Sequence, residues 1–250
     1  MEFDLSGRTA FVTGATSGLG RRFARVLAEA GADIAIAGRR ADRLVDLQAE
    51  IESLGRKCVA VPLDVMDVSA IPRAFDAAEA VLGPIQVLVN NAGMSRDGKA
   101  EDVAPADFDA VMDTNLRAPF FMASEAARRM IARGAGGRII NIASIGAFRV
   151  LSALATYCMS KAGLAMMTQC LAREWARYDI NVNAICPGYI ETEINSDWFK
   201  TEGGQKQIKS FPKRRLAQES DLDGVLLLLA SDASRAITGS LMTVDDAQVL

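Results

Sequence analysis

The sequence predicts a single α/β domain, doubly wound around a mostly or fully parallel seven-stranded sheet flanked by helices. Short apolar, β-branched runs alternate with longer stretches of helical period, which is the pattern of repeated strand–helix units. Continuous apolar runs, such as residues 34–37 and 87–90, suit strands that helices cover on both faces, as in a parallel sheet. No repeat, low-complexity tract or linker divides the 250 residues, so residues 1–250 are expected to form one domain.

Each expected strand is a short run rich in Val, Ile, Ala or Thr, and helical stretches fall between the strands. The first strand leads through a glycine-rich turn into an amphipathic helix at residues 21–30. Residues 194–216 break the rhythm and predict an excursion over the edge of the sheet. In chain order the strands are TAFVT at Thr9–Thr13, DIAIA at Asp33–Ala37, KCVAVP at Lys57–Pro62, QVLVN at Gln86–Asn90, RIINIA at Arg138–Ala143, NVNAIC at Asn181–Cys186 and LMTV at Leu241–Val244.

Composition excludes several classes of function. The chain has 28 Lys and Arg against 31 Asp and Glu, a net charge of -3, and so lacks the basic field that binds nucleic acid or anionic lipid. Because it has no histidine, Ser-His-Asp and Cys-His hydrolases, His-ligated zinc and proximal-His haem are excluded. We expect no metal site and no membrane association, because there is no CxxC pair, cationic leader or membrane-length apolar run. A cytoplasmic location is expected, with buried free thiols at Cys58, Cys158, Cys170 and Cys186.

The turn after the first strand predicts a phosphate-binding site. Gly14, Gly18 and Gly20 permit a tight turn and a close backbone approach, and the free amides at the start of the following helix attract an anion. A pyrophosphate fits such a turn. Three glycines alone are also compatible with an ordinary glycine-rich turn.

Three polar residues later in the chain predict acid–base chemistry. Tyr157 and Lys161 are four residues apart, so on a helix they share one face, and the ammonium is expected to lower the pKa of the phenol. Ser144 stands thirteen residues before Tyr157, at the carboxyl end of a strand, where its hydroxyl can bond a carbonyl oxygen that gains charge. Such a tyrosine could serve as acid or base in a chain without histidine.

The end of the second strand bears on the choice of cofactor. Dinucleotide folds that prefer NAD usually place a carboxylate there, which binds both ribose hydroxyls and repels a 2′-phosphate. Here Gly38 occupies that place, Asp33 sits at the opposite end of the strand, and Arg39 and Arg40 follow. Because a guanidinium can bind phosphate oxygens through two hydrogen bonds, we expect NADP(H) to be favoured over NAD(H). The other interpretation makes both arginines solvated loop charges.

The TGxxxGxG spacing of the glycine turn resembles the short-chain dehydrogenase/reductase family. The resemblance continues in order through Asn90–Gly93 (NNAG), Asn115, Ser144, the YxxxK pair Tyr157 and Lys161, and Pro187–Gly188 with Thr192 (PGxxxT), and spans about residues 8–245. One departure stands in the segment DDAQ at residues 245–248, where Asp246 and Ala247 take the place of the two glycines in the family's usual VDGG. The loss of two glycines there bears on the local turn and on assembly.

The resemblance implies roles for these residues. Tyr157 would exchange a proton with the substrate oxygen, Lys161 would hold the nicotinamide ribose, Asn115 would orient a helix and a water, and Ser144 would position the carbonyl. The family also implies a homotetramer or homodimer built on the helices of Asn115 and Tyr157. The cofactor-binding set that it implies comprises Gly14, Ser17, Gly18, Leu19 and Gly20 for the pyrophosphate, Asp64 and Val65 for the adenine, Asn91, Ala92 and Gly93 for the adenosine and ribose, and Pro187, Gly188, Ile190 and Thr192 for the carboxamide.

The excursion at residues 194–216 is the expected substrate lid, with Trp198, Phe199 and Phe211 as aromatic cover. Its Lys and Arg side chains either attract an anionic substrate or form a solvated helix face. The chain resembles 3-oxoacyl-carrier-protein reductases, our main interpretation, and gluconate 5-dehydrogenases, the alternative; a non-catalytic NADP-binding regulator is the third. In each enzyme reading the partner is a small ketone or alcohol. The candidate pocket residues are Met94, Phe148, Leu151, Tyr189, Ile194 and Trp198.

Overall fold

The computed structural model describes residues 3–191 and 196–250. Its sheet has the strand order β3-β2-β1-β4-β5-β6-β7, and every pair is parallel, as the sequence predicts. The strand order reverses between β1 and β4, and ligands of doubly wound sheets bind at that switch point. The strands are β1 (Thr9–Thr13), β2 (Asp33–Gly38), β3 (Cys58–Pro62), β4 (Val87–Asn90), β5 (Gly137–Ile142), β6 (Ile180–Pro187) and β7 (Leu241–Val244).

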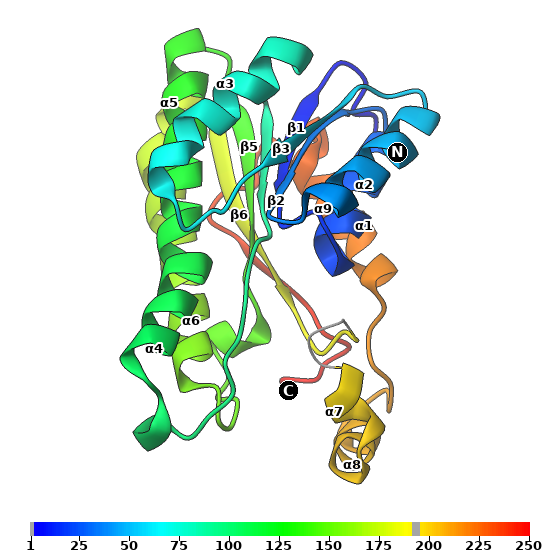
Figure 1. Ribbon diagram of the computed structural model, residues 1–250, viewed down its shortest axis with the longest axis vertical. Coiled ribbons are helices and arrows are strands. Elements are labelled where there is room, and N and C mark those ends of the chain that lie inside the picture. Colours follow the sequence, from blue (N-terminus) through cyan, green and yellow to red (C-terminus); the bar gives the residue numbers. More distant parts are fainter. Residues whose placement is uncertain (1–2, 192–195) are drawn as a thin grey trace.

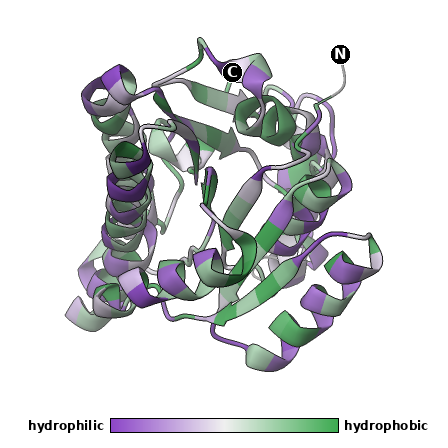
Figure 2. Ribbon diagram, turned by 90° about the horizontal axis from the view of Figure 1, so that it is seen from above, coloured by the Kyte–Doolittle hydropathy of each residue, from purple (hydrophilic) through white to green (hydrophobic). Residues whose placement is uncertain are grey.

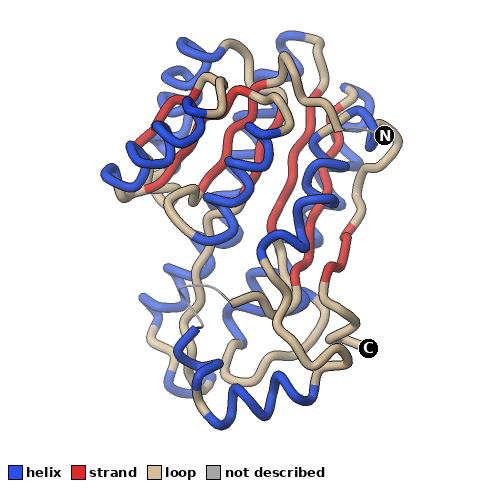
Figure 3. Tube along the Cα trace, turned by 90° about the vertical axis from the view of Figure 1, so that its right-hand side faces the viewer, coloured by secondary structure: helices blue, strands red, loops and turns tan. Residues whose placement is uncertain are grey.

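Two layers of helices cover the sheet (Figure 1). One face carries α1 (Gly18–Glu29), α2 (Ala41–Ser53) and α9 (Asp223–Ala230), and the other carries α3 (Ile71–Leu82), α5 (Ala118–Arg133) and α6 (Ala155–Trp175). The shorter helices α4 (Pro105–Met112), α7 (Ser196–Lys200) and α8 (Glu202–Ser210) lie toward the carboxyl ends of the strands, at the same end as the chain's C-terminus. Figure 3 shows this end as loops and short helices below the strands.

The core forms because successive side chains of a strand point to opposite faces. In β1, Ala10 and Val12 pack under α1, while Phe11 faces the other layer and stacks on Phe75 of α3 with ring centroids 4.9 Å apart. Figure 2 shows the strands mostly green, whereas the helices mix green with purple. Burying the sheet on both faces is what the continuous apolar runs require.

Two local features depart from simple expectation. Asn115 was expected in a helix and lies in a π-helical turn, Asp113–Arg117, between α4 and α5. Such turns occur frequently at functional sites. The cysteines were all expected to be buried: Cys58 and Cys186 are, Cys158 is half-buried and Cys170 is exposed on the outer side of α6, so that prediction was wrong for Cys170.

The excursion between β6 and α9 leaves the sheet and returns to it. It contains α7 and α8, and Ala217 on the returning chain pairs with Ile190 in a single parallel bridge. No helix in residues 3–191 and 196–250 is long and apolar enough to cross a membrane. The same described residues contain no group of three or more Cys, Asp or Glu side chains placed to hold a metal ion.

Candidate active site

Ser144 and Tyr157 meet at the carboxyl end of β5. Ser144 lies two residues beyond that strand, and its Oγ accepts a hydrogen bond from the Gly146 amide at 3.0 Å. The Ser144 side chain also approaches the Tyr157 phenol on α6, closely enough to favour its ionised form. A Cβ at Gly146 would lie 3.4 Å from both Ser144 Oγ and Tyr157 Cε1, so the backbone packs closely around the pair. The two hydroxyls that the sequence proposed as partners therefore adjoin each other.

Lys161 is buried one helical turn from Tyr157. Its Nζ donates a 2.8 Å hydrogen bond to the carbonyl of Ile142, the last residue of β5, and lies 5.6 Å from the centroid of the Tyr157 ring. The position of a Cβ on Gly93 would be 3.6 Å from Nζ, so the amine reaches the loop after β4. Burial lowers the pKa of Lys161 to about 8.

The expected effect of Lys161 on Tyr157 was in the wrong direction. Burial raises the pKa of Tyr157 above its ordinary value, and the nearby Ser144 side chain opposes this only in part. The physical reason is that loss of hydration around the buried phenol is the largest effect, while the Lys161 ammonium is used in a hydrogen bond to the Ile142 carbonyl. Tyr157 is therefore a neutral hydroxyl at physiological pH.

The buried amine has a measurable effect on stability. The pKa of Lys161 is about 8 in the folded chain and 10.5 ordinarily, so between these values the unfolded chain binds a proton that the folded chain does not. The free energy of unfolding must then rise with pH in that range. Relative to Lys161→Met, we expect the wild-type protein to gain about 1–2 kcal/mol between about pH 7.5 and 9.5, measured by urea unfolding. A difference that stays flat would contradict the burial.

Asn115 ties the loop after β4 to α6. Its Nδ2 donates to the Met94 carbonyl at 2.8 Å and to Ser160 Oγ at 3.0 Å, and its Oδ1 accepts from the Met94 amide at 2.9 Å. The side chain is fully buried. Both ends of the amide are thus used to fix the backbone beside Lys161.

The glycine turn after β1 is packed too tightly for side chains. Gly14 has a φ of 66°, and a Cβ there would lie 2.8 Å from Ala92 Cα; a Cβ on Gly20 would overlap the Gly14 carbonyl and Asn91 Nδ2. The Asn91 amide group holds this arrangement, donating to the Thr13 carbonyl at 2.9 Å. Gly18 and Leu19 begin α1, and Gly18 also has a positive φ, of 52°.

The start of α1 is open to an anion. Ser17, the residue before the helix, makes no side-chain cap, because its hydroxyl accepts from Arg40 at 2.7 Å. The same guanidinium donates to Thr16 Oγ1 at 2.7 Å. Uncapped amides at a helix N-terminus favour a phosphate, so the turn fits the pyrophosphate of a dinucleotide.

Two threonines that sequence reasoning missed shape this cradle. Thr13 Oγ1 accepts from the Asn91 and Ala92 amides at 3.0 and 3.1 Å, which joins the ends of β1 and β4. Thr16 fills the space beside Gly38, where a Cβ would lie 2.7 Å from Thr16 Cγ2. A carboxylate at position 38 would therefore collide with Thr16, unless the threonine moved. In the sequence, only the position of both threonines inside the TGxxxGxG segment pointed to them.

The remaining cofactor candidates border the same edge of the sheet. Arg39 and Asp64 are exposed at the ends of β2 and β3, and Val65 is buried next to Asp64. Pro187 ends β6, Gly188 follows it, and Ile190 is buried. Thr192 and Ile194 lie outside the described residues.

The expected substrate residues are only partly brought together. Leu151 lies against Gly146 and therefore near the Ser144–Tyr157 pair, and Met94 is held by Asn115. Tyr189 stacks on Phe211 with centroids 5.2 Å apart and meets Phe199 edge-on at 6.0 Å. Phe148 and Trp198 are about half exposed, at 51% and 52%. Trp198 Nε1 donates to Gln207 of the same excursion at 2.8 Å, so its ring is tied to α8.

The basic residues of the excursion are partly paired. Lys213 and Arg215 both contact the Asp246 carboxylate, at 2.6 and 2.7 Å, and Lys200 pairs with Asp197 at 3.0 Å. Lys206, Lys209 and Arg214 are exposed. Of the two interpretations of these cations, substrate attraction or a solvated face, neither includes the pairing of Lys213 and Arg215 with Asp246, which comes from a distant part of the chain.

Comparisons with known proteins agree with this geometry. A family model described as short chain dehydrogenase matches residues 8–203. The chain is 38% identical over 244 residues to 2-dehydro-3-deoxy-D-gluconate 5-dehydrogenase of Escherichia coli (strain K12), covering 97% of this chain and 96% of that protein. It is 35% identical over 244 residues to gluconate 5-dehydrogenase of Gluconobacter oxydans (strain 621H), covering 97% and 95%.

A solved structure of similar sequence has the same fold. The gluconate 5-dehydrogenase of Burkholderia cenocepacia J2315, in complex with NADP and tartrate, superposes with a TM-score of 0.95 at 36% identity, over 99% of this chain and 97% of that one. The matched residues include the glycine turn, Ser144, Tyr157 and Lys161. The fold, the ordered motifs and these matches lead to one conclusion: this chain belongs to the short-chain dehydrogenase family of NAD(P)-dependent oxidoreductases.

Proposed function

We propose that the protein is an NADP(H)-dependent dehydrogenase of a sugar acid or related polyol. The observation that carries the chemistry is the juxtaposition of Ser144 and Tyr157 beside buried Lys161, next to the glycine cradle. The relatives named above act on gluconate or its dehydrated derivative, and their names support our sugar-acid alternative better than our main 3-oxoacyl interpretation. Family membership as an oxidoreductase also argues against the non-catalytic regulator.

In the proposed mechanism the chain's own residues handle the proton and the orientation. Bound NADP(H) supplies the hydride, and Lys161, Asn91, Ala92 and Gly93 would hold its ribose beside the ends of β4 and β5. Ser144 donates a hydrogen bond to the carbonyl oxygen that gains charge, which stabilises the transition state. Tyr157, kept protonated by its raised pKa, gives its proton to that oxygen during reduction and takes it back during oxidation.

An anionic substrate has support from the charges around this site. Arg149 is exposed on the loop after Ser144, and its positive charge is close enough to Tyr189 to favour the ionised form of that phenol. Lys206 and Lys209 add exposed charge on α8. A carboxylate on the substrate would be attracted by these cations, whereas a neutral polyol would gain less.

The test is a panel of substrates assayed with both cofactors. Gluconate, 2-dehydro-3-deoxygluconate, polyols and a 3-oxoacyl thioester should be compared by the absorbance of NADPH or NADH. We expect sugar acids to give the highest kcat/KM. Higher kcat/KM with the thioester would return the assignment to the 3-oxoacyl reductases, and tight NADPH binding without turnover would overturn the enzymatic proposal.

We expect the protein to use NADPH in preference to NADH. Arg39 is exposed beside Gly38, and Thr16 leaves no room for the carboxylate that NAD-preferring folds place there. Charge-assisted hydrogen bonds contribute about 1.5–3 kcal/mol, so kcat/KM should favour NADPH over NADH by roughly tenfold to a few hundredfold.

Arg39→Ala should remove most of that preference. Arg40 is the poorer choice, because it also holds Thr16 and Ser17. Arg235→Ala, an exposed change at the opposite edge of the sheet, is the matched control. Gly38→Asp should select NADH only together with Thr16→Ser, which removes the colliding methyl group. Equal kcat/KM for the two cofactors in the wild-type protein would refute the preference.

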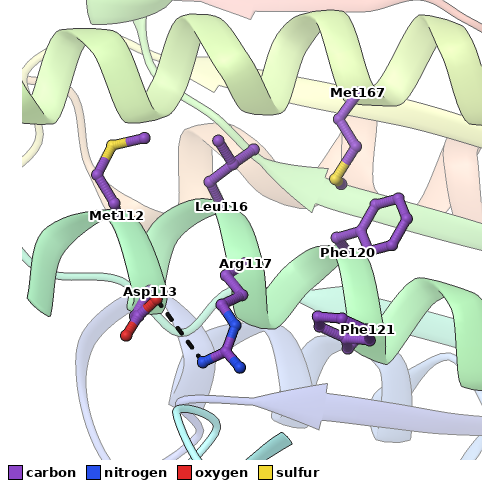
Figure 4. Close-up of a pocket in the computed structure, with 7 residues that line it drawn as sticks. All are labelled: Met112, Asp113, Leu116, Arg117, Phe120, Phe121 and Met167. Atoms are coloured by element: carbon purple, nitrogen blue, oxygen red, sulfur yellow. Dashed lines mark ion pairs between the residues drawn. The ribbon is translucent and has the colours of Figure 1, made fainter. Parts of the chain in front are cut away.

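We also propose that the chain assembles into a homotetramer through α5 and α6. A surface pocket of about 410 Å³ lies between α4, the π-helical turn, α5 and α6 and is lined mainly by Met112, Leu116, Phe120, Phe121 and Met167. Figure 4 shows Phe120 and Met167 pointing toward each other, and Leu116 pointing toward α6. Phe120 and Phe121 are each 41% exposed, and apolar patches of this kind mark association surfaces.

Phe120→Asp should therefore yield smaller species in light scattering after gel filtration, because a carboxylate in an apolar interface loses its hydration. Val45→Asp, on exposed α2, is the control and should leave the assembly unchanged. A monomeric wild-type protein would refute this proposal.

A further inference from the structure

The chain ends in a compact turn that contacts three parts of the active-site end. We call residues 245–249 the C-terminal brace. Asp245 organises it, since its carboxylate oxygens accept from the Ala247 and Val249 amides, both at 3.0 Å. Asp246 and Ala247 have φ values of 52° and 64°, a region that L side chains rarely adopt. The turn is thus kept although the family's two glycines are missing, and it must be held by other contacts.

Two contacts fix the brace to the catalytic side. Gln248 Oε1 accepts from the Tyr189 amide at 2.7 Å, just after β6. Arg149, on the loop that begins at Ser144, donates to the Val249 carbonyl at 2.7 Å. The brace therefore spans from the Ser144 loop to the end of β6.

The third contact is made with the lid, by which we mean residues 196–216. Asp246 is only 14% exposed and lies between Lys213 Nζ at 2.6 Å and Arg215 NH2 at 2.7 Å; the latter contact is an ion pair without hydrogen-bond alignment. Both cations stand on the chain returning from α8, next to Phe211, which stacks on Tyr189. Glycine at position 246 could make neither contact. In this chain the Asp246 carboxylate therefore links the C-terminal brace to the lid.

We propose that Asp246 is a positioning residue that holds the lid over the substrate site by way of Lys213 and Arg215. This rests on the proposed function, because the lid's role is to bind the sugar-acid or alcohol substrate. Asp246 touches neither the glycine cradle nor Tyr157, so it acts on substrate affinity and not on proton transfer or cofactor binding. Removing its charge frees the returning chain without removing any group that reacts.

Asp246→Asn tests the proposal, because it keeps the shape and removes the charge. We expect KM for the substrate to rise about threefold to tenfold, kcat to change less than about twofold and the Kd for NADPH to stay constant. Hydrogen exchange of peptides from residues 196–216 should become faster. Lys213→Gln should act in the same direction, and the double variant should be affected by less than the sum of the two, because both substitutions remove the same Asp246–Lys213 contact. Lys57→Gln, an exposed lysine directly before β3, is the control.

Asp246→Gly distinguishes the role of the carboxylate in holding the lid from the role of residue 246 in shaping the turn. It removes the charge and also relieves the left-handed backbone, so it should keep or raise Tm and still speed exchange in the lid. A fall in Tm for Asp246→Asn, with KM and lid exchange unchanged, would mean that Asp246 only shapes the turn and would overturn the proposal. If the wild-type protein turned over no substrate, the proposed function would fail. Hydrogen exchange of residues 196–216 in Asp246→Asn would then test by itself whether Asp246 holds the lid. Faster exchange than in the wild-type protein would support the contact, and unchanged exchange would refute it.

Discussion

Tyr157→Phe should lower turnover at least about 10²-fold, and up to about 10⁴-fold, while leaving the Kd for NADPH nearly unchanged. The substitution removes the hydroxyl that lies beside Ser144 and can protonate the substrate oxygen. Because the pKa of Tyr157 is raised by burial, ketone reduction should persist across neutral pH. Alcohol oxidation, which needs a proton acceptor, should become faster as pH increases.

The measurements are steady-state kcat in both directions and NADPH fluorescence titration. Tyr178→Phe is the matched control, because that phenol follows α6 and hydrogen-bonds Arg177 away from Ser144. Retention of more than about a tenth of wild-type turnover, with chemistry still limiting the rate, would show that another group supplies the proton.

Gly20→Ala should abolish tight cofactor binding and destabilise the fold. A methyl group at this position would overlap the Gly14 carbonyl and Asn91 Nδ2, which are parts of two different strand ends. Overpacking of this kind costs about 1–3 kcal/mol, and the displaced turn should weaken NADPH binding by roughly 10²-fold or more. One methyl group would cause both effects, because Gly20 lies in α1 and packs directly against the glycine turn.

Gly224→Ala provides the contrast. Gly224 lies in α9, where a Cβ would meet nothing within 4 Å, so alanine there should stabilise the protein by about 0.5–1 kcal/mol and leave NADPH binding unchanged. Thermal unfolding and NADPH titration of the two variants test both expectations. Equal behaviour of Gly20→Ala and Gly224→Ala would show that the cradle has room that the structure does not indicate.

Sequence periodicity and short motifs determined the order and positions of the strands and the elements that carry the site residues. The seven strands begin and end within one or two residues of their expected positions, because alternation of apolar runs with helical stretches is a local property. Tyr157 and Lys161 share a helix face for the same reason. The carboxyl ends of parallel strands meet at one edge, so Ser144, Asn91 and the glycine turn could be expected together without knowing their contacts.

Tertiary structure alone decided how those groups are paired. Lys161 donates to the Ile142 carbonyl, Thr16 occupies the space beside Gly38, and Asp246 pairs with two cations of the lid. These contacts join segments that are far apart in the chain, and their distances depend on how whole helices and loops pack. The direction of the Tyr157 pKa follows from the same packing, because burial acts over the entire surroundings of a side chain, whereas a four-residue spacing describes only one neighbour.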